Sequence, residues 1–212
     1  MCGRFANQQE SKGAWDEYFE TPYPISETFA KSVSTGYNIA PTQIIPIATA
    51  GGWLAARWGM IAPWANEIST KFATFNARSE TIAERATFRS AWKKGQQCVI
   101  PAIGYYEWKK EGEAKQPYFV QSEDQTPLFF GGLYEPSRGG IPASCTIITL
   151  PACESLAPLH QRMPLMLSSN SINPWIREGT QQSPIPATSF STVSQSVNNV
   201  RNQGPELIQR MN

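Results

Sequence analysis

The chain has 212 residues and a formal net charge of +1, with 41% hydrophobic and 17% charged residues. This composition excludes a disordered tail, a fibrous protein and a polycation that would coat nucleic acid without selectivity. The longest apolar runs, 128–133 and 146–150, are far shorter than the ~18 residues of a membrane-spanning helix, so we expect a soluble, cytoplasmic protein with no membrane partner.

The first half of the chain predicts short helices and one hairpin. The expected elements are an amphipathic helix within 8–20, a hairpin of strands 43–49 and 53–59, an extended segment at 72–78 and a helix at 79–85. The first helix rests on Trp15, Tyr18 and Phe19, whose i, i+3, i+4 spacing places them on one face. The hairpin rests on its central Gly-Gly turn. Ser79 is expected to cap the second helix, with Ile82 facing the core.

The second half is strongly β in character. Strands are expected at 97–100, 104–110, 117–122, 127–133, 144–150, 163–167 and 190–197, with a short helix around 173–176. Short polar turns at 111–113 and 123–125 predict antiparallel hairpins. A chain of this length can bury its core as one domain. We expect one compact α+β domain over residues 1–212, mostly antiparallel and curled toward a barrel, with a few short peripheral helices.

The residue types exclude the usual structural metal sites. The four cysteines, at positions 2, 98, 145 and 153, form no CxxC pair, and His160 is the only histidine. Zinc and iron–sulfur centres are therefore not expected, and neither is another metal or a cofactor.

The most reactive group lies at the start of the chain. A methionine before a small residue is normally removed, which would leave Cys2 with a free α-amine beside its thiol. The pKa of an α-amine is about 7.7–8.0 and that of a thiol about 8.5, so both are partly nucleophilic near neutral pH. An aldehyde can form an imine with the amine and then close with the thiol to a thiazolidine. The alternative is that Cys2 is simply a small residue that begins a strand.

Two further stretches contain candidate chemistry. In the NARSE sequence at 76–80, Asn76 can orient an oxygen and Arg78 offers a fork of donors for phosphate. The alternative is a capped helix with a solvated arginine. In the GYYEWKK sequence at 104–110, strand alternation places Tyr105, Glu107 and Lys109 on one face. A carboxyl group among aromatic rings loses hydration, which favours its protonated form and suits general acid catalysis; the alternative is an edge-strand Glu paired with Lys.

Two more polar positions remain open to either a structural or a functional interpretation. His160 precedes Arg162 by two residues, so both side chains point the same way if the segment is extended. A single histidine is nevertheless more often structural than catalytic. Asn38 lies in an apolar turn, where a local hydrogen bond to the backbone is the safer interpretation. Trp64 follows a proline-broken loop and is either a core residue or an exposed stacking platform.

Taken together, these motifs resemble a known family. The matching blocks are MCGRF at 1–5, YNIAP at 37–41, WGMIAPW at 58–64, NARSET at 76–81, GYYEWKK at 104–110, LHQRMP at 159–164 and NVRNQGPELI at 199–208. They span almost the whole chain and resemble the SOS response-associated peptidase (SRAP) family. Members of that family shield abasic sites in single-stranded DNA by forming a covalent DNA–protein crosslink.

The resemblance implies roles for individual residues. The implied catalytic residues are Cys2, Asn76, Glu107 and His160. The implied DNA-binding residues are Arg4, Asn38, Pro41, Trp64, Arg78, Trp108, Arg162 and Met163. Arginines would grip phosphates and raise the thiolate fraction of Cys2, which is expected at the floor of a cationic cleft. Gln161 and Met163 stand where some relatives have Asp and Arg, and Trp64 where some have two tryptophans, which puts DNA affinity in more doubt than chemistry.

The implied partner is single-stranded DNA with abasic sites, bound by a monomer without metal, near the nucleoid if the source is bacterial. Related activities would be autoprocessing of residues before Cys2 and abasic-site lyase activity. One alternative is an N-terminal-nucleophile hydrolase such as a glutamine amidotransferase, although the chain has no Asn-Gly dipeptide of the kind those enzymes use. The other is a non-covalent module that binds single strands through arginines and aromatic rings.

Overall fold

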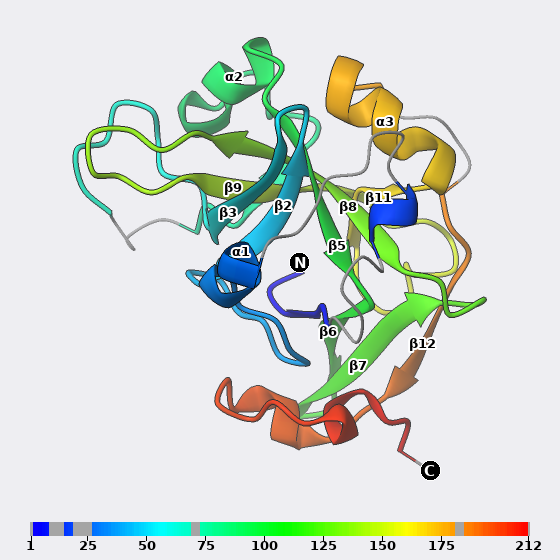
Figure 1. Ribbon diagram of the computed structural model, residues 1–212. Helices are drawn as coiled ribbons and strands as arrows, with labels where there is room; N and C mark the ends of the chain where they lie inside the picture. Colours follow the sequence, from blue (N-terminus) through cyan, green and yellow to red (C-terminus); the bar gives the residue numbers. More distant parts are fainter. Residues whose placement is uncertain (1, 9–14, 19–26, 69–72, 181–184, 212) are drawn as a thin grey trace.

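The computed structural model describes residues 2–8, 15–18, 27–68, 73–180 and 185–211, which form two β-sheets with short helices around them (Figure 1). The strands are β1 (Phe5–Ala6), β2 (Ile44–Thr49), β3 (Gly52–Trp58), β4 (Asn76–Arg78), β5 (Gln97–Ala102), β6 (Gly104–Glu111), β7 (Ala114–Ser122), β8 (Leu128–Glu135), β9 (Ser144–Pro151), β10 (Arg162–Pro164), β11 (Met166–Leu167) and β12 (Thr188–Thr192). The helices are η1 (Asp16–Tyr18), α1 (Glu27–Ser32), α2 (Ala86–Lys93), α3 (Ser169–Glu178), η2 (Gln195–Asn198) and η3 (Pro205–Ile208).

The larger sheet is partly ring-like. Its strand order is β10-β9-β3-β2-β5-β8-β11, β4 pairs with β9, and a further β8–β9 pairing joins the two sides of the sheet. The pairs β3–β9 and β4–β9 are parallel, and the other pairs are antiparallel. The predicted α+β class and the mostly antiparallel, curled sheet are confirmed.

An N-terminal aromatic residue anchors the chain start in the main core. Phe5 packs edge-on against Trp58 at 5.0 Å and Phe130 at 6.2 Å between ring centroids. Its backbone exchanges hydrogen bonds with Ile39, at 3.1 and 2.8 Å, and it pairs with Tyr105 of β6. This burial of apolar rings places the first residues of the chain between the two sheets, next to β6.

The smaller sheet has the order β1-β6-β7-β12, so it joins the beginning of the chain to its end. The short helices η2 and η3 lie along this sheet, in orange and red at the bottom of Figure 1. Val197 and Leu207 of these helices are buried with Tyr106 and Phe119 in a small core of their own. Apolar packing therefore holds the C-terminal segment against β6.

Two sequence predictions were wrong at element boundaries. Residues 79–85 form turns rather than a helix, and α2 begins only at Ala86. The Ser79 amide donates to Thr149 of β9 and so continues the edge of β4, and the Ser79 hydroxyl donates to Glu80 Oε2 at 3.2 Å rather than accepting from a helix amide. Ile82 is buried as expected. The strand predicted over 190–197 ends at Thr192, because Ser194 caps the 3-10 helix η2 by accepting from the Ser196 amide.

Most of the other predicted elements agree with the structure. The hairpin of β2 and β3 is present, and so is the hairpin of β6 and β7 with its turn at 111–113. The hairpin predicted around 123–125 is wrong, because β7 pairs with β6 and β12 in the small sheet, whereas β8 pairs with β5, β9 and β11 in the large sheet. The helix around 173–176 is part of α3. Of the helix predicted within 8–20, residues 9–14 and 19–20 lie outside the described residues, and 16–18 form the 3-10 helix η1. None of the helices in the described part of the chain has the length and apolar character that crossing a membrane requires.

Candidate active site and nucleic-acid interface

A polar cavity opens where the beginning and the end of the chain meet the small sheet. Its volume is about 610 Å³, and it is lined by Arg4, Glu107, Trp108, Lys115, His160 and Asn198. These residues come from the segment before β1, from β6 and β7, from the turn before β10 and from η2. Two cations, one carboxyl group, one imidazole and one aromatic ring therefore face a common space, a combination suited to an anionic, base-bearing ligand.

Cys2 lies beside this cavity but does not line it. Its side chain has 0% exposure and belongs to the main core. Burial raises the pKa of the Cys2 thiol, and the negative charge of Glu107 raises it further. The expectation of an accessible thiol with an enhanced thiolate fraction is thus wrong for the chain that carries Met1. The physical reason is that Phe5 anchors the N-terminal segment in the core, and the side-chain charge that acts on the thiol is that of Glu107 rather than that of an arginine.

Asn76 is joined directly to Cys2. Located at the start of β4, it donates from Nδ2 to the Cys2 carbonyl oxygen at 2.7 Å. The pairing of β4 with β9, in which Asn76 lies opposite Ile147, brings it there from 74 residues away in sequence. Its Oδ1 is buried and has no hydrogen-bond partner among the described residues. A buried amide oxygen aimed at this position is suited to accept a hydrogen bond from an amine or a hydroxyl group.

Glu107 lies on β6 next to Cys2 and is only 5% exposed. Its Oε1 accepts a hydrogen bond from the Trp108 amide at 3.3 Å. Burial raises the pKa of Tyr105 well above its ordinary value, and the charges of Cys2 and Glu107 add to the shift. Thiol, carboxyl and phenol therefore form one electrostatic cluster. The predicted alternation along β6 is reflected here, because Tyr105 packs in the core that contains Cys2 and Tyr106 in the C-terminal core.

His160 is held by the backbone of Arg162. The Arg162 amide donates to His160 Nδ1 at 2.9 Å, so the neutral imidazole carries its proton on Nε2. The Arg162 carbonyl oxygen lies 3.1 Å from the same nitrogen, where a protonated ring can donate. Both protonation states thus have a backbone partner, which suits a residue that transfers protons.

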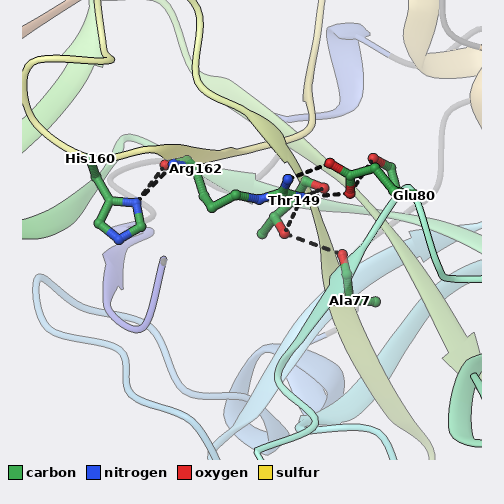
Figure 2. A network of polar contacts seen from close by, with 6 residues as sticks. Ala77, Glu80, Thr149, His160 and Arg162 are labelled. Carbon is green, nitrogen blue, oxygen red and sulfur yellow. Dashed lines mark hydrogen bonds and ion pairs between the residues drawn. The ribbon is translucent and has the colours of Figure 1, made fainter.

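The side chains of His160 and Arg162 point in opposite directions, as Figure 2 shows. The expectation that they share a face is wrong because His160 lies in a turn, where its amide donates to Leu156, and the strand begins only at Arg162. The Arg162 guanidinium instead binds both carboxylate oxygens of Glu80 and the carbonyl oxygen of Thr149, the latter at 2.6 Å. Its exposure is 15% and that of Glu80 is 46%. In the absence of a ligand, this expected phosphate donor is thus already bound.

The remaining expected DNA contacts divide into accessible and buried residues. Trp64 is 59% exposed and borders a second cavity of about 220 Å³, Arg78 is exposed, and Pro41 is half-buried. Asn38 and Met163 are both buried, so neither presents a surface to DNA in this conformation. Their expected contacts do not fit, because Asn38 is surrounded by backbone carbonyls and Met163 packs in the main core.

Arg4 and Trp108 form one wall of the large cavity. The Arg4 guanidinium carbon lies 5.8 Å from the centroid of the Trp108 ring, and Arg4 Nη1 donates to Asn38 at 2.7 Å and to the Val197 carbonyl at 3.0 Å. Trp108 Nε1 donates to Asn198 at 2.7 Å. Both expected binding residues are therefore at the cavity, with their orientations defined by the C-terminal segment.

Known proteins of one family match this chain over almost its whole length. A family model described as SOS response associated peptidase (SRAP) matches residues 1–200. The chain belongs to the SRAP family. It is 34% identical over 234 residues to abasic site processing protein YedK of Escherichia coli (strain K12), covering 99% of each chain. It is 33% identical over 186 residues to abasic site processing protein HMCES of Gallus gallus, covering 72% of this chain and 55% of that one.

Solved structures share the SRAP fold of this chain. A crystal structure of a protein from Bordetella bronchiseptica matches with a TM-score of 0.76 and 25% identity, covering 91% of this chain and 100% of the other. A structure from Bacteroides thetaiotaomicron matches with a TM-score of 0.80 and 21% identity, covering 99% and 100%. At that lower identity the likeness shows the fold alone.

Two cavity residues of this SRAP chain escaped sequence reasoning. Lys115 lies on β7 opposite Lys110 of β6, and Asn198 is the last residue of η2. Lys115 could have been found from the sequence, because the predicted turn at 111–113 sets it opposite Lys110 of the preceding strand. Nothing local marks Asn198. Among the described residues, no group of three or more His, Cys, Asp or Glu could hold a metal ion.

The ion pair of Arg162 with Glu80 predicts a pH-dependent stability. Hydrogen bonds from Arg162 lower the pKa of Glu80 from 4.5 to about 2. Because the folded pKa is depressed, the pair stabilises the protein above pH 4.5, and this contribution is lost as the pH falls toward 2. We expect Glu80→Gln to lower the free energy of unfolding by at most about 1 kcal/mol at neutral pH, since the pair is half exposed. Urea unfolding of both proteins from pH 7 to 2 checks this; a difference that persists at pH 2 would contradict it.

Proposed function

We propose that this protein senses and shields abasic sites in single-stranded DNA by forming a thiazolidine crosslink through Cys2 after Met1 has been removed. Family membership supports the substrate class, because curated SRAP relatives are named abasic site processing proteins. The observation that supports the chemistry is the contact of Asn76 with Cys2 beside Glu107 and a cavity that also contains His160.

The first step opens the sugar. An abasic deoxyribose is mostly a closed hemiacetal, which has no carbonyl for an amine to attack. The Glu107 carboxyl group donates a proton to the ring oxygen and accepts the proton of the C1′ hydroxyl, so the C1′–O4′ bond breaks without net proton change. Its burial beside Cys2 keeps the resulting aldehyde next to the nucleophile.

The second step forms the crosslink. The Cys2 α-amine adds to C1′, and proton transfer through His160 lets the hydroxyl group leave as water, which gives an imine. Cys2 Sγ then adds to the same carbon while its proton passes to the nitrogen, so that one water is released overall. The raised pKa of the buried thiol assigns the initial attack to the amine and the ring closure to sulfur. Asn76 Oδ1 accepts a hydrogen bond from the reacting nitrogen.

Exclusion from water is consistent with this order of events. Burial favours a neutral amine, which is the nucleophilic form, and disfavours a thiolate. It also protects an imine from hydrolysis until sulfur closes the ring. Two secondary activities use the same groups. An imine that does not close to a thiazolidine is the species from which a lyase cleaves DNA. Autoprocessing of residues before Cys2 would expose the α-amine that forms this imine. We propose both as secondary activities of this site.

We also propose how the strand binds. Arg4 and Lys115 face the cavity and Arg78 is exposed at the end of β4, so they are the phosphate contacts, whereas exposed Trp64 stacks on a base. Arg162 binds phosphate only by exchanging its Glu80 partner. In this proposal residues 1–212 act as one domain and as a monomer. The C-terminal helices pack against β6, which pairs with β1, and Asn198 of η2 completes the lining of the cavity.

Replacing Trp64 tests the stacking contact. We expect Trp64→Ala to weaken binding of undamaged single-stranded DNA by about 1–3 kcal/mol, roughly 5- to 150-fold, because base stacking on an aromatic ring is lost. Fluorescence anisotropy at fixed salt measures the effect. Trp92→Ala is the matched control, since Trp92 is half-buried on α2 and outside both cavities. Equal binding by the Trp64 variant and the wild type would remove this residue from the interface.

One measurement tests the whole proposal. The protein is incubated with a single-stranded oligonucleotide that carries one abasic site, and its intact mass is determined under denaturing conditions. The expected mass is that of the chain without Met1 plus the oligonucleotide less one water. The unmodified protein mass alone, together with binding that is fully reversible and falls steeply with salt, would favour the non-covalent binding module instead.

A further inference from the structure

The C-terminal segment 195–203 is a wall of the large cavity without a role in the chemistry above. It contains η2 and the loop that follows, and it contributes Asn198 to the cavity lining. Its outer residues are exposed, among them the polar Asn199 and the basic Arg201 on either side of Val200, which is 47% exposed. The question is what holds this mostly exposed segment in place.

Besides the apolar packing of Val197, one buried side chain, that of Asn38, holds the segment in place. The Asn38 amide nitrogen donates toward three backbone carbonyl oxygens of the segment, at 3.2 Å to Val197, 3.0 Å to Asn199 and 2.9 Å to Asn202. Its amide oxygen accepts from Arg4 Nη1 at 2.7 Å. The orientation of the amide is unambiguous, because a flipped group would set its oxygen against three carbonyls and its NH₂ against a cation.

The segment also binds the backbone of Asn38 through the side chain of Gln203. Gln203 Oε1 accepts from the Asn38 backbone amide at 3.2 Å, and Gln203 Nε2 donates to the Asn38 carbonyl at 3.1 Å. Asn38 is thus bonded through both its side chain and its backbone. Because buried carbonyls without a donor are costly, loss of this amide would release the segment rather than leave it in place.

The position of Arg4, one of the two cations that line the cavity, depends on the same contacts. Arg4 donates both to Asn38 and to the Val197 carbonyl, and Trp108 beneath it donates to Asn198. A displaced segment therefore removes one partner of Arg4 and the partner of the Trp108 ring at once. The contacts that orient the cation and the ring converge on residues 197 and 198.

We propose that segment 195–203 is a DNA-contacting wall of the cavity and that Asn38 is the positioning residue that fastens it. The proposal rests on the proposed function and deepens it: Asn38 acts on affinity for the strand, not on the covalent step. Its effect reaches the DNA through Arg4, Trp108 and Asn198. The polar outer edge of the segment, with Asn199 and Arg201, extends the phosphate-binding surface beyond the cavity.

Two variants separate the parts of this arrangement. Asn38→Asp keeps an acceptor for Arg4 but cannot donate to the three carbonyls, so it releases the segment specifically. Gln203→Ala removes the grip from the segment's side and leaves the buried Asn38 amide intact, so it stays informative if Asn38→Asp folds poorly. Asn7→Asp is the matched control. Asn7 is also buried, its Oδ1 accepts from the Gly36 amide, and its Nδ2 has no partner among the described residues.

Two readouts are measured on the full chain. The first is trypsin cleavage after exposed Arg201, followed in mass spectra by the release of residues 202–210, since trypsin also cleaves after exposed Arg210. The second is the crosslinking rate as a function of the concentration of abasic single-stranded DNA. We expect Asn38→Asp and Gln203→Ala to accelerate cleavage after Arg201 and to raise the half-saturating DNA concentration about tenfold, with the maximal rate unchanged. Asn7→Asp should match the wild type in both.

Several results would overturn the proposal. Unchanged cleavage and unchanged half-saturation in both variants would show that Asn38 does not fasten a functional wall. A lower maximal rate at unchanged half-saturation would place Asn38 in the chemistry instead. If wild-type protein forms no crosslink, the proposed function fails, yet the fastening is still judged by cleavage after Arg201 and by anisotropy with undamaged single strands.

Discussion

Replacing Cys2 with Ala is expected to abolish the crosslink to abasic DNA that survives SDS denaturation. The variant retains an α-amine after Met1 removal, so it still forms an imine, but without sulfur the thiazolidine cannot close. We therefore expect loss of the stable product to background on denaturing gels and a new product that borohydride reduction can trap. Because the amine attacks first in our mechanism, the trapped product should form at a rate similar to that of the wild-type crosslink.

The control for this experiment is Cys153→Ala. Cys153 is the half-buried cysteine of the four, whereas Cys2, Cys98 and Cys145 are fully buried. Exposure alone would thus make Cys153 the better nucleophile, and its variant should nevertheless crosslink normally. Full crosslinking by Cys2→Ala with loss in Cys153→Ala would reassign the nucleophile. An amino-terminal extension that prevents Met1 removal should abolish both the stable crosslink and the product trapped by borohydride, because the Cys2 nitrogen then stays in a peptide bond. A tagged protein that still crosslinks would exclude the role of the α-amine.

The second large effect is expected for Glu107→Gln. The amide cannot donate a proton to the ring oxygen and accept one from the C1′ hydroxyl during ring opening. General acid–base catalysis of this kind contributes typically 10²–10⁴-fold, so we expect a rate decrease of roughly 100-fold or more. Non-covalent affinity should change little, because the residue is 5% exposed and provides no positive charge for phosphate. Single-turnover gel assays at saturating abasic DNA, with anisotropy on undamaged DNA, measure both quantities.

Glu111→Gln provides the matched control on the same strand. Glu111 is exposed at the end of β6, where it accepts from the Tyr118 hydroxyl at 2.5 Å, and it is outside the cavity lining. Its substitution makes the same Glu-to-Gln replacement with little expected effect on rate. A Glu107 variant as fast as this control would exclude the residue as the proton donor, and ring opening would then have to use His160.

The strands could be predicted because their signals are local. Alternating apolar residues and the short polar turn at 111–113 suffice to define the β6–β7 hairpin, whose strands are neighbours in sequence. The turn at 123–125 joins two sheets instead, because β8 pairs with β5, β9 and β11 rather than with β7. The helix at 79–85 was mispredicted because a distant strand competes for the backbone of Ser79: its amide donates to the Thr149 carbonyl and continues the extended segment. Such a competitor, 70 residues away along the chain, leaves no trace in the local pattern.

The candidate site divides in the same way. The identity of the reactive residues could be predicted, since an N-terminal Cys, a single His and a Glu among aromatic residues are unusual in themselves. Their burial could not. Asn38 reads as an exposed turn residue or a local cap, yet its amide binds carbonyls about 160 residues later. Arg162 reads as a free phosphate donor, yet Glu80 neutralises it (Figure 2).

The sequence by itself determined the inventory of this protein: the strands, the hairpins, the reactive groups and the membership in a family of abasic site processing proteins. Only the tertiary structure decided which of these groups meet. Parallel pairing of β4 with β9 brings Asn76 to Cys2, and Phe5 in the core turns the presumed open thiol into a buried one. The physical reason is that periodicity reports which face of an element is apolar, whereas strand register and core insertion depend on contacts between residues far apart in the chain.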